Sequence, residues 1–204
     1  MDTKEHIMDV AMKLFAEKGF ETTTVRDIAS KGKVNLALIN YHFVSKEGLL
    51  KNIFQQRALN LQFHIWEIAS NKTFTEIQKI HKIIEFYVER MFANHEFHKV
   101  ILRELLSENR EDMHADTIGI ISENAKIIIT IIEKGIRKKT FKKVDPELCF
   151  ASIIGTIHHL MNSKILRKNI FGGKDKKDPI TLPSFKKRVT KHIQEILSNH
   201  LIAD

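Results

Sequence analysis

Two side chains suited to reading nucleic-acid bases lie near the start of this 204-residue sequence. The carboxamide of Asn40 can form a pair of hydrogen bonds with adenine, and the guanidinium of Arg26 can reach guanine or a phosphate. Asn40 belongs to the stretch VNLALINYHF, Val34–Phe43, in which apolar side chains are mixed with Asn, Tyr and His. Aliphatic side chains can contact thymine methyl groups. The stretch is therefore expected to be a surface that reads bases, in spite of its apolar composition.

Three helices are expected to position these side chains. The first is expected at 3–18, where Thr3 can act as the N-cap and apolar residues recur with helical spacing. A second is expected at 25–31, and a third at 36–42 with Asn35 as its N-cap. A longer helix followed by two short ones is the order found in helix-turn-helix DNA-binding domains, in which the last helix lies in the major groove.

The short helices carry their own start and stop signals. Thr24 and Asp27 have the spacing of a capping box, with Asp in place of the usual Glu or Gln. A Gly-Lys pair ends the second helix, and a left-handed conformation would be mildly strained at Lys33. Ser45 can cap a fourth helix. These signals predict a helix-turn-helix at about 24–43.

A helical wheel separates two faces of the third helix. Ile39 and Phe43 fall together and can pack on a small core. Lys46, at the start of the next helix, is expected to lie near a phosphate. Four basic residues and one acid lie between positions 24 and 46, a local excess of +3, whereas residues 1–47 balance at zero. The face expected to meet DNA holds Leu36, Ala37, Leu38, Asn40 and Tyr41.

Composition and motif content limit the compartment and the classes of function that fit this sequence. The net charge is +8, and residues 134–191 contain sixteen Lys or Arg against four Asp or Glu. The single Cys149 excludes an internal disulfide and fits a reducing compartment. The sequence has no signal peptide and no apolar run of membrane-spanning length, so we expect a cytoplasmic protein without a membrane partner. It has no nucleophile–base pair, phosphate loop or metal-ligand cluster, so we expect no catalysis, metal or cofactor.

The stretch TVRDIASKGKVNLALINYHFVSKEGLL resembles the DNA-binding signature of the TetR/AcrR transcriptional regulators, and the likeness covers about residues 7–55. One departure is the Gly-Lys pair, because Ala-Gly is common in the family's turn. The resemblance implies a DNA-binding domain at 1–47, a dimer on double-stranded DNA, and an effector that releases it. The DNA-binding residues that it implies, together with the Asn35 cap, are Thr24, Val25, Arg26, Asn35, Leu36, Ala37, Leu38, Asn40, Tyr41, His42 and Lys46.

The remaining residues, 48–204, are also expected to be helical. The run KIIITIIEKGI is rich in β-branched residues, as strands are, but its apolar residues recur with helical spacing. The fold class expected is therefore all-α with about nine helices: an N-terminal three-helix helix-turn-helix domain and a C-terminal helical effector and dimerisation domain. Beyond the fourth helix, which runs past Trp66, helices are expected at 75–93, 96–108, 114–139, 146–168 and 183–201.

Apolar faces in the C-terminal part could form an effector pocket, a dimer interface or simply the core of the chain. The helix expected at 146–168 is apolar on two faces, so it needs two partners, one of which could be a second subunit. The candidate pocket residues are Phe63, Trp66, Phe86, Tyr87, Met91, Arg103 and Met161. The candidate interface residues are Ala151, Gly155, His158, Val189, Ile193 and Ile196.

Together these features predict a sequence-specific transcriptional regulator. The leading hypothesis is a repressor that binds a palindromic operator as a homodimer and is released by a small-molecule effector. A second hypothesis keeps the DNA binding but replaces the effector with a protein partner. A third, an enzyme with an incidental helix-turn-helix, lacks any catalytic constellation in the sequence.

Overall fold

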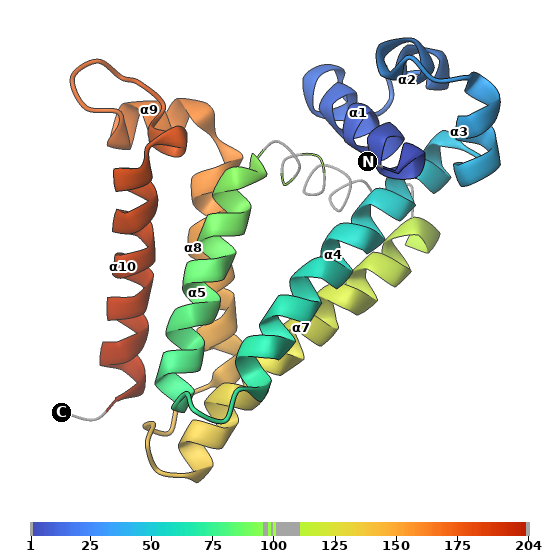
Figure 1. Cartoon of the computed structure of the whole chain (residues 1–204). Coiled ribbons are helices and arrows are strands. Elements are labelled where there is room, and N and C mark those ends of the chain that lie inside the picture. Colours follow the sequence, from blue (N-terminus) through green and yellow to red (C-terminus); the bar gives the residue numbers. More distant parts are fainter. Residues whose placement is uncertain (1, 96–97, 99, 101–110, 203–204) are drawn as a thin grey trace. The chain divides into compact units, whose positions relative to one another are not determined.

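The computed structural model describes residues 2–95, 98, 100 and 111–202, and side chains are described outside 111–117 (Figure 1). Within these ranges every regular element is a helix, which confirms the all-α fold class. None of these helices is both long and apolar enough to cross a membrane. The elements are α1 Thr3–Lys18, α2 Val25–Gly32, α3 Leu36–Phe43, α4 Lys46–Ser70, α5 Glu76–Ala93, α7 Glu111–Arg137, α8 Pro146–Asn162, α9 Lys164–Phe171, the 3₁₀ helix η1 Pro179–Thr181 and α10 Pro183–Leu201.

The chain divides into two compact units, 1–61 with 96–121, and 62–95 with 122–204. The first unit contains α1, α2, α3 and the start of α4 around a core of buried apolar side chains. Ile7, Phe15 and Ile28 are fully enclosed there. The rings of Phe15 and Phe20 lie 5.0 Å apart across the turn at Gly19 (φ 93°), as a C-terminal glycine allows.

The second unit is built on α5, α8 and α10, and α10 packs along α5 (Figure 1). Two polar contacts join these distant segments: His81 Nε2 lies 2.8 Å from Ser198 Oγ, and Gln194 donates to the His81 carbonyl at 3.1 Å. Burial lowers the pKa of His81 below its usual value. The imidazole is therefore a mainly neutral part of the packing at pH 7.

Two expectations about helix ends were wrong. Asp2, and not Thr3, is the N-cap of α1, and its side chain accepts a hydrogen bond from the Lys4 amide at 3.3 Å. The helix expected at 146–168 is two helices, because Ser163 has an extended backbone and caps α9 with its hydroxyl. The helix expected at 96–108 lies outside the continuous part of the described chain.

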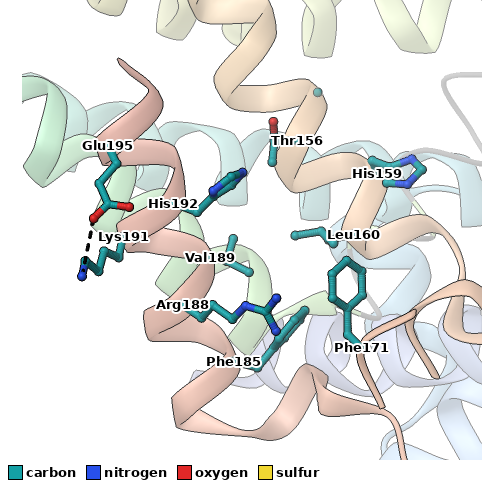
Figure 2. Close-up of a pocket in the computed structure, with 11 residues that line it drawn as sticks. Thr156, His159, Leu160, Phe171, Phe185, Arg188, Val189, Lys191, His192 and Glu195 are labelled. Atoms are coloured by element: carbon teal, nitrogen blue, oxygen red, sulfur yellow. Dashed lines mark ion pairs between the residues drawn. The ribbon is translucent and has the colours of Figure 1, made fainter. Parts of the chain in front are cut away.

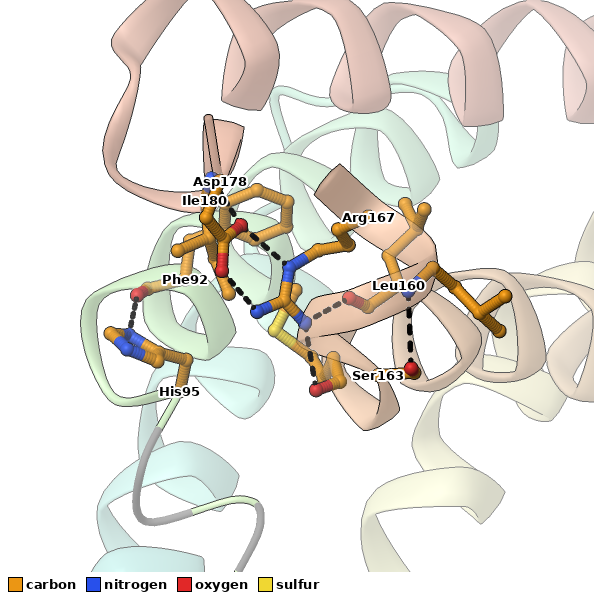
Figure 3. A network of polar contacts seen from close by, with 9 residues as sticks. Phe92, His95, Leu160, Ser163, Arg167, Asp178 and Ile180 are labelled. Atoms are coloured by element: carbon orange, nitrogen blue, oxygen red, sulfur yellow. Dashed lines mark hydrogen bonds and ion pairs between the residues drawn. The ribbon is translucent and has the colours of Figure 1, made fainter. Parts of the chain in front are cut away.

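The break between α8 and α9 is stabilised by a buried arginine (Figure 3). Arg167 is 2% exposed, and its Nη1 donates to the carbonyls of Leu160 and Met161 at 2.8 and 3.0 Å. Its Nε and Nη2 form a two-pronged ion pair with Asp178 at 2.9 and 2.8 Å. Arg167 therefore satisfies the carbonyls that the end of α8 leaves free and ties down the loop before η1.

Candidate DNA-binding site

The capping box places the first turn of α2. The Asp27 amide donates to Thr24 Oγ1 at 3.1 Å, and the Thr24 amide donates to Asp27 Oδ2 at 2.8 Å, as the spacing predicts. These bonds from the Thr24 backbone and hydroxyl hold the pKa of Asp27 below its usual value. In the turn so fixed, Arg26 is exposed, whereas Val25 packs partly against the core.

The turn between α2 and α3 is made at the unusual Gly-Lys pair. Lys33 adopts the left-handed conformation there, at φ 52° and ψ 40°. Its amide donates to the Ser30 carbonyl at 3.3 Å, and the Val34 amide donates to the Ala29 carbonyl at 3.0 Å. His6 of α1 lies 2.9 Å from the Gly32 carbonyl. Because several groups fix this turn, Lys33 is held in its conformation and the start of α3 is defined.

The face of α3 opposite the core is open. Asn35 accepts a hydrogen bond from the Ala37 amide at 2.8 Å, which confirms its role as N-cap. Ile39 and Phe43 are buried, as the helical wheel predicts. Ala37, Leu38, Asn40 and Tyr41 are exposed, Tyr41 to 81%, while His42 is half-buried.

One member of this face was misplaced. Leu36 was expected to point outward with its neighbours, but it is half-buried and packs against the core of the first unit. The cause is its position in the first turn of α3, beside Val34, which packs on the same core. Any base contact by Leu36 would use only the part of its side chain that remains accessible.

Lys46 is engaged within the chain. Its ammonium donates to the Phe20 carbonyl at 2.9 Å and to the Glu21 carbonyl at 3.4 Å, and it lies 4.3 Å from the centroid of the Phe20 ring. The side chain thus ties the start of α4 to the turn after α1. The sequence did not reveal this role, because the acceptors are backbone carbonyls about 25 residues away.

A sharp turn joins α3 to α4. Val44, 85% exposed, has φ 66° and ψ −44°, and the Ser45 amide donates across it to the Phe43 carbonyl at 2.7 Å. A β-branched residue is rarely found at positive φ. A Cβ atom at Gly48 would overlap the same Phe43 carbonyl, so the glycine permits the close approach of α4. Ser45 caps α4 by accepting from the Gly48 amide at 2.9 Å, as predicted.

The family model described as "Bacterial regulatory proteins, tetR family" matches residues 7–53, which span α1, α2, α3 and the start of α4. The N-terminal region of the chain is therefore a TetR-type DNA-binding region, and the chain as a whole is similar to TetR/AcrR regulators. The family model therefore confirms the resemblance that the sequence of this region suggested.

Individual TetR/AcrR relatives match either the N-terminal region or most of the chain. The probable regulator YttP of Bacillus subtilis is 41% identical over 56 residues, which are 28% of this chain and 27% of YttP. The repressor KstR2 of Rhodococcus jostii is 26% identical over 164 residues, 72% of each chain. The structure of FadR from Bacillus subtilis in complex with stearoyl-CoA has a TM-score of 0.72 at 22% identity and covers 93% of this chain and 96% of FadR. At that identity the likeness shows the fold alone.

The candidate effector-pocket residues do not come together as one set. Tyr87, Met91 and Met161 are buried in the packing of the second unit, and burial raises the pKa of Tyr87 well above its usual value. Phe86 is half-buried, with its ring 5.0 Å from that of His64. Phe63 is exposed. Arg103 lies outside the described residues.

Trp66 is the candidate pocket residue that lines a described groove. The groove has a volume of about 370 Å³ and lies among the α4, α5 and α7 segments of the second unit. Lys79, Lys126 and Lys134 stand around it with Glu76 and Glu123. A feature that the sequence did not reveal lies on α7 one turn before Ile127: Asn124 is 2% exposed, and its side-chain oxygen has no hydrogen-bond partner among the described residues.

The candidate interface residues divide into an exposed and a buried group. Ala151, Gly155 and Ile196 are exposed. Val189 and Ile193 were misplaced, because both are buried in the core of their own chain, where α10 packs along α5. Val189, 5% exposed, also lines a groove between α8 and α10.

A groove of about 760 Å³ runs between α8 and α10 (Figure 2). Leu160, Phe171 and Phe185 contribute apolar surface to it, and His159 and His192 stand at its sides. His158, beside this groove on α8, is half-buried, and burial lowers its pKa below the usual value.

Proposed function

We propose that this protein is a TetR/AcrR-type repressor that binds a palindromic operator as a homodimer and is released by a small-molecule effector. Residues 1–47 bind the DNA, and residues 48–204 hold the effector and form the dimer. The observation that carries the DNA-binding assignment is the exposed face of α3 above the buried Ile39 and Phe43. A short helix anchored on one side and open on the other is the form in which a helix-turn-helix enters the major groove.

The exposed side chains divide by the contacts they suit. Asn40 can read adenine, and Leu38 and Ala37 can contact thymine methyl groups. Arg26 in the first turn of α2 can reach guanine or phosphate. Tyr41 and the amides at the start of α4 suit phosphates, as do Thr24, Asn35 and His42 at the edges of the face. Lys46 supports this surface by fixing α4, since its ammonium already serves two carbonyls.

The experiment is a gel-shift titration with DNA from the promoter of the gene itself. Asn40→Ala and Arg26→Ala should each weaken specific binding by about 5- to 150-fold, because one good base contact is worth about 1–3 kcal/mol. Asn60→Ala and Arg137→Ala, which remove exposed side chains of the same types elsewhere, are the matched controls. If the two test variants bind as tightly as their controls, this docking of α3 is excluded.

A homodimer is supported by the exposed face of α8. Leu148, Ala151 and Gly155 lie on it, and a Cβ atom at Gly155 would meet only open space. Exposed Ile196 of α10 adds a further apolar side chain. Small residues let two helices approach closely, so Ala151→Arg should convert a dimer into a monomer in light scattering. Lys143→Arg, a change at an exposed position off α8, should leave the mass unchanged.

The effector is proposed to be a molecule that has a long apolar part and at least one hydrogen-bond donor. Two observations support this chemistry: the relative FadR was solved with stearoyl-CoA, and the buried oxygen of Asn124 has no partner among the described residues. A buried acceptor without a partner costs about 1–3 kcal/mol. A ligand that donates to it would recover part of that free energy on binding.

Stearoyl-CoA is the first probe. It should raise the melting temperature and release the operator in the gel shift. Asn124→Leu should raise the melting temperature of the free protein, because it removes the side-chain oxygen that has no partner among the described residues, and should weaken the response to the probe. If Asn124→Leu leaves the response intact, the amide has no part in effector binding.

The alternative, a DNA-bound interaction module, keeps the helix-turn-helix but has no small-molecule effector. It would be favoured if the operator complex stayed intact across a panel of acyl thioesters, fatty acids and steroids while the protein captured a defined partner on DNA. Both functions place the protein in the cytoplasm with its DNA.

A further inference from the structure

Helix α9 exposes its apolar side chains and buries a charged one. Ile165, Leu166 and Ile170 are 73%, 47% and 61% exposed, whereas Arg167 is 2% exposed. At 100° per residue the three aliphatic side chains and Asn169 occupy one continuous arc of the helix. A solvated surface helix shows the opposite arrangement, with its apolar arc inward. Three large aliphatic side chains on one short helix form an exposed patch of the kind that marks an interaction surface.

The orientation of α9 is fixed by its polar contacts (Figure 3). Arg167 cannot turn outward without giving up two carbonyls of α8 and both bonds to Asp178. Ser163 also holds the start of the helix, because its hydroxyl accepts from the Leu166 amide at 3.2 Å. The aliphatic arc is therefore presented to solvent by a built scaffold.

A basic turn adjoins this arc. After α9 the chain folds back, with the Lys176 amide donating to the Gly173 carbonyl and the Lys177 amide to the Gly172 carbonyl, both at 3.2 Å. A Cβ atom at Gly172 would overlap the carbonyl oxygens of Lys168 and Lys177, so only glycine fits there. Exposed Lys174, with these two lysines, is thereby held close to the C-terminal end of the helix.

We propose that this surface, here called the α9 patch, binds the surface of an anionic lipid bilayer. The aliphatic side chains would enter the boundary between headgroups and acyl chains, and the lysines would lie among anionic headgroups. The site is independent of the proposed repressor function. Its members are Ile165, Leu166 and Ile170 with Lys168, Lys174, Lys176 and Lys177.

Charge complementarity identifies the lipid. The α9 patch holds four lysines against one exposed acid, Asp175, which lies 3.8 Å from Lys177. Lysine is depleted in protein–protein interfaces, whose binding energy rests on Trp, Tyr and Arg, and the α9 patch has none of these exposed. Long lysine side chains next to an aliphatic face are typical of helices that lie in a membrane interface.

This inference also gives a role to part of the C-terminal basic excess, which DNA binding does not use. The expectation of no membrane partner rested on the lack of a spanning segment, and a helix that lies on the surface needs none. A spanning segment crosses the bilayer, whereas the α9 patch would attach to one side of the bilayer only.

The test is flotation of the full-length protein with vesicles of phosphatidylglycerol and phosphatidylcholine in equal parts, compared with vesicles of phosphatidylcholine alone. Binding should occur on the anionic vesicles and fall with added salt. The triple variant K174Q/K176Q/K177Q should lower the partition coefficient roughly 100-fold, since each lysine near the surface contributes about 5-fold. The double variant I165S/I170S should abolish flotation with its circular dichroism unchanged.

The matched control for charge is K72Q/K143Q/K187Q, which removes three exposed lysines of the same unit outside the α9 patch. If this control loses as much binding as the test triple, attraction is a property of net charge and the proposal is overturned. Equal binding to neutral vesicles also overturns it. The proposal is overturned as well if the wild-type protein does not float with anionic vesicles and I165S/I170S changes the molecular mass. The aliphatic arc would then be a contact between protein chains.

Discussion

Helices α3 and α9 are both eight residues long and rich in apolar residues, yet they are packed in opposite ways. The first buries Ile39 and Phe43 and exposes a mixed polar and apolar face. The second buries Arg167 and exposes Ile165 and Ile170. Apolar content therefore does not decide which face of a short helix is inward. The neighbours decide it, according to whether they offer apolar surface or unsatisfied carbonyls.

The two arrangements are stabilised by different free-energy terms. Around α3 the stabilisation comes from removing aliphatic and aromatic surface from water. Around α9 it comes from hydrogen bonds between one guanidinium and groups that would otherwise be buried without partners. Apolar packing of the kind around α3 tolerates a change of one apolar neighbour. The hydrogen bonds around Arg167 depend on every donor and acceptor being present.

The largest effect expected from this difference is at Asp178. Asp178→Ala leaves the Arg167 guanidinium buried without its counter-charge, so the free energy of unfolding should fall by roughly 3–5 kcal/mol in urea titration. The double variant Arg167→Met with Asp178→Ala should recover only part of the loss, because it removes the unpaired charge but leaves the Leu160 and Met161 carbonyls without their donor. Asp175→Ala, at an exposed acid of the same turn, is the control. A loss no greater than that of the control would show that α9 is held by apolar packing after all.

The second test separates stability from recognition on α3. Ile39→Ala removes a fully enclosed side chain and should lower the free energy of unfolding by about 3 kcal/mol. Leu38→Ala, one position away on the exposed face, should change it by less than about 0.5 kcal/mol and weaken operator binding. Equal losses of stability for both variants would contradict the assignment of the two faces.

A smaller change in the free energy of unfolding is expected at the turns that follow α3 and α9. Val44→Gly should raise the free energy of unfolding by about 1 kcal/mol, because glycine adopts positive φ without the steric cost of a β-branched side chain. Lys176→Gly, at φ 48° in the basic turn, should gain less, since an unbranched side chain is less strained there. Urea titrations of both variants measure the difference, and a loss at Val44 would rule out strain in this turn.

The smallest effect is a dependence of stability on pH at the Arg167–Asp178 pair beside α9. Hydrogen bonding to Arg167 holds the pKa of Asp178 below its usual value. A carboxyl with a lowered folded pKa stabilises the fold above its unfolded pKa, about 3.9, and that contribution is lost as the pH falls through the folded value. Between about pH 5 and about pH 3 the wild type should therefore lose more stability than the Arg167→Met, Asp178→Ala variant. Parallel curves would show that the pair is not linked to the folding equilibrium.

The sequence predicted the helix-turn-helix in detail because its signals are local. The Thr24–Asp27 capping box and the Asn35 cap each join residues within three positions of one another, and the structure shows both. The failures nearby have non-local causes. Leu36 is drawn toward the core of the first unit, and Lys46 is bound to carbonyls at positions 20 and 21.

In the C-terminal part the sequence predicted helices but not their faces. The periodicity of the last helix marked Val189 and Ile193 correctly as apolar-stripe residues, but it could not show that α5 of the same chain covers them. For the same reason it did not separate Tyr87, Met91 and Met161, which are in the core, from Trp66, which lines a groove. Amphipathic periodicity reports that a face is buried and leaves its partner open.

What the sequence determined by itself is the all-α class, the positions of most helix ends and the family of the N-terminal region, since each is set by bonds and spacings within a few residues. Only the tertiary structure decided that α8 ends at Ser163, that Arg167 turns inward and that Ile165 and Ile170 turn outward. The physical reason is the distance of the partners along the chain. Arg167 finds Asp178 eleven positions away, and His81 finds Ser198 across 117, so their pairing depends on how the helices pack.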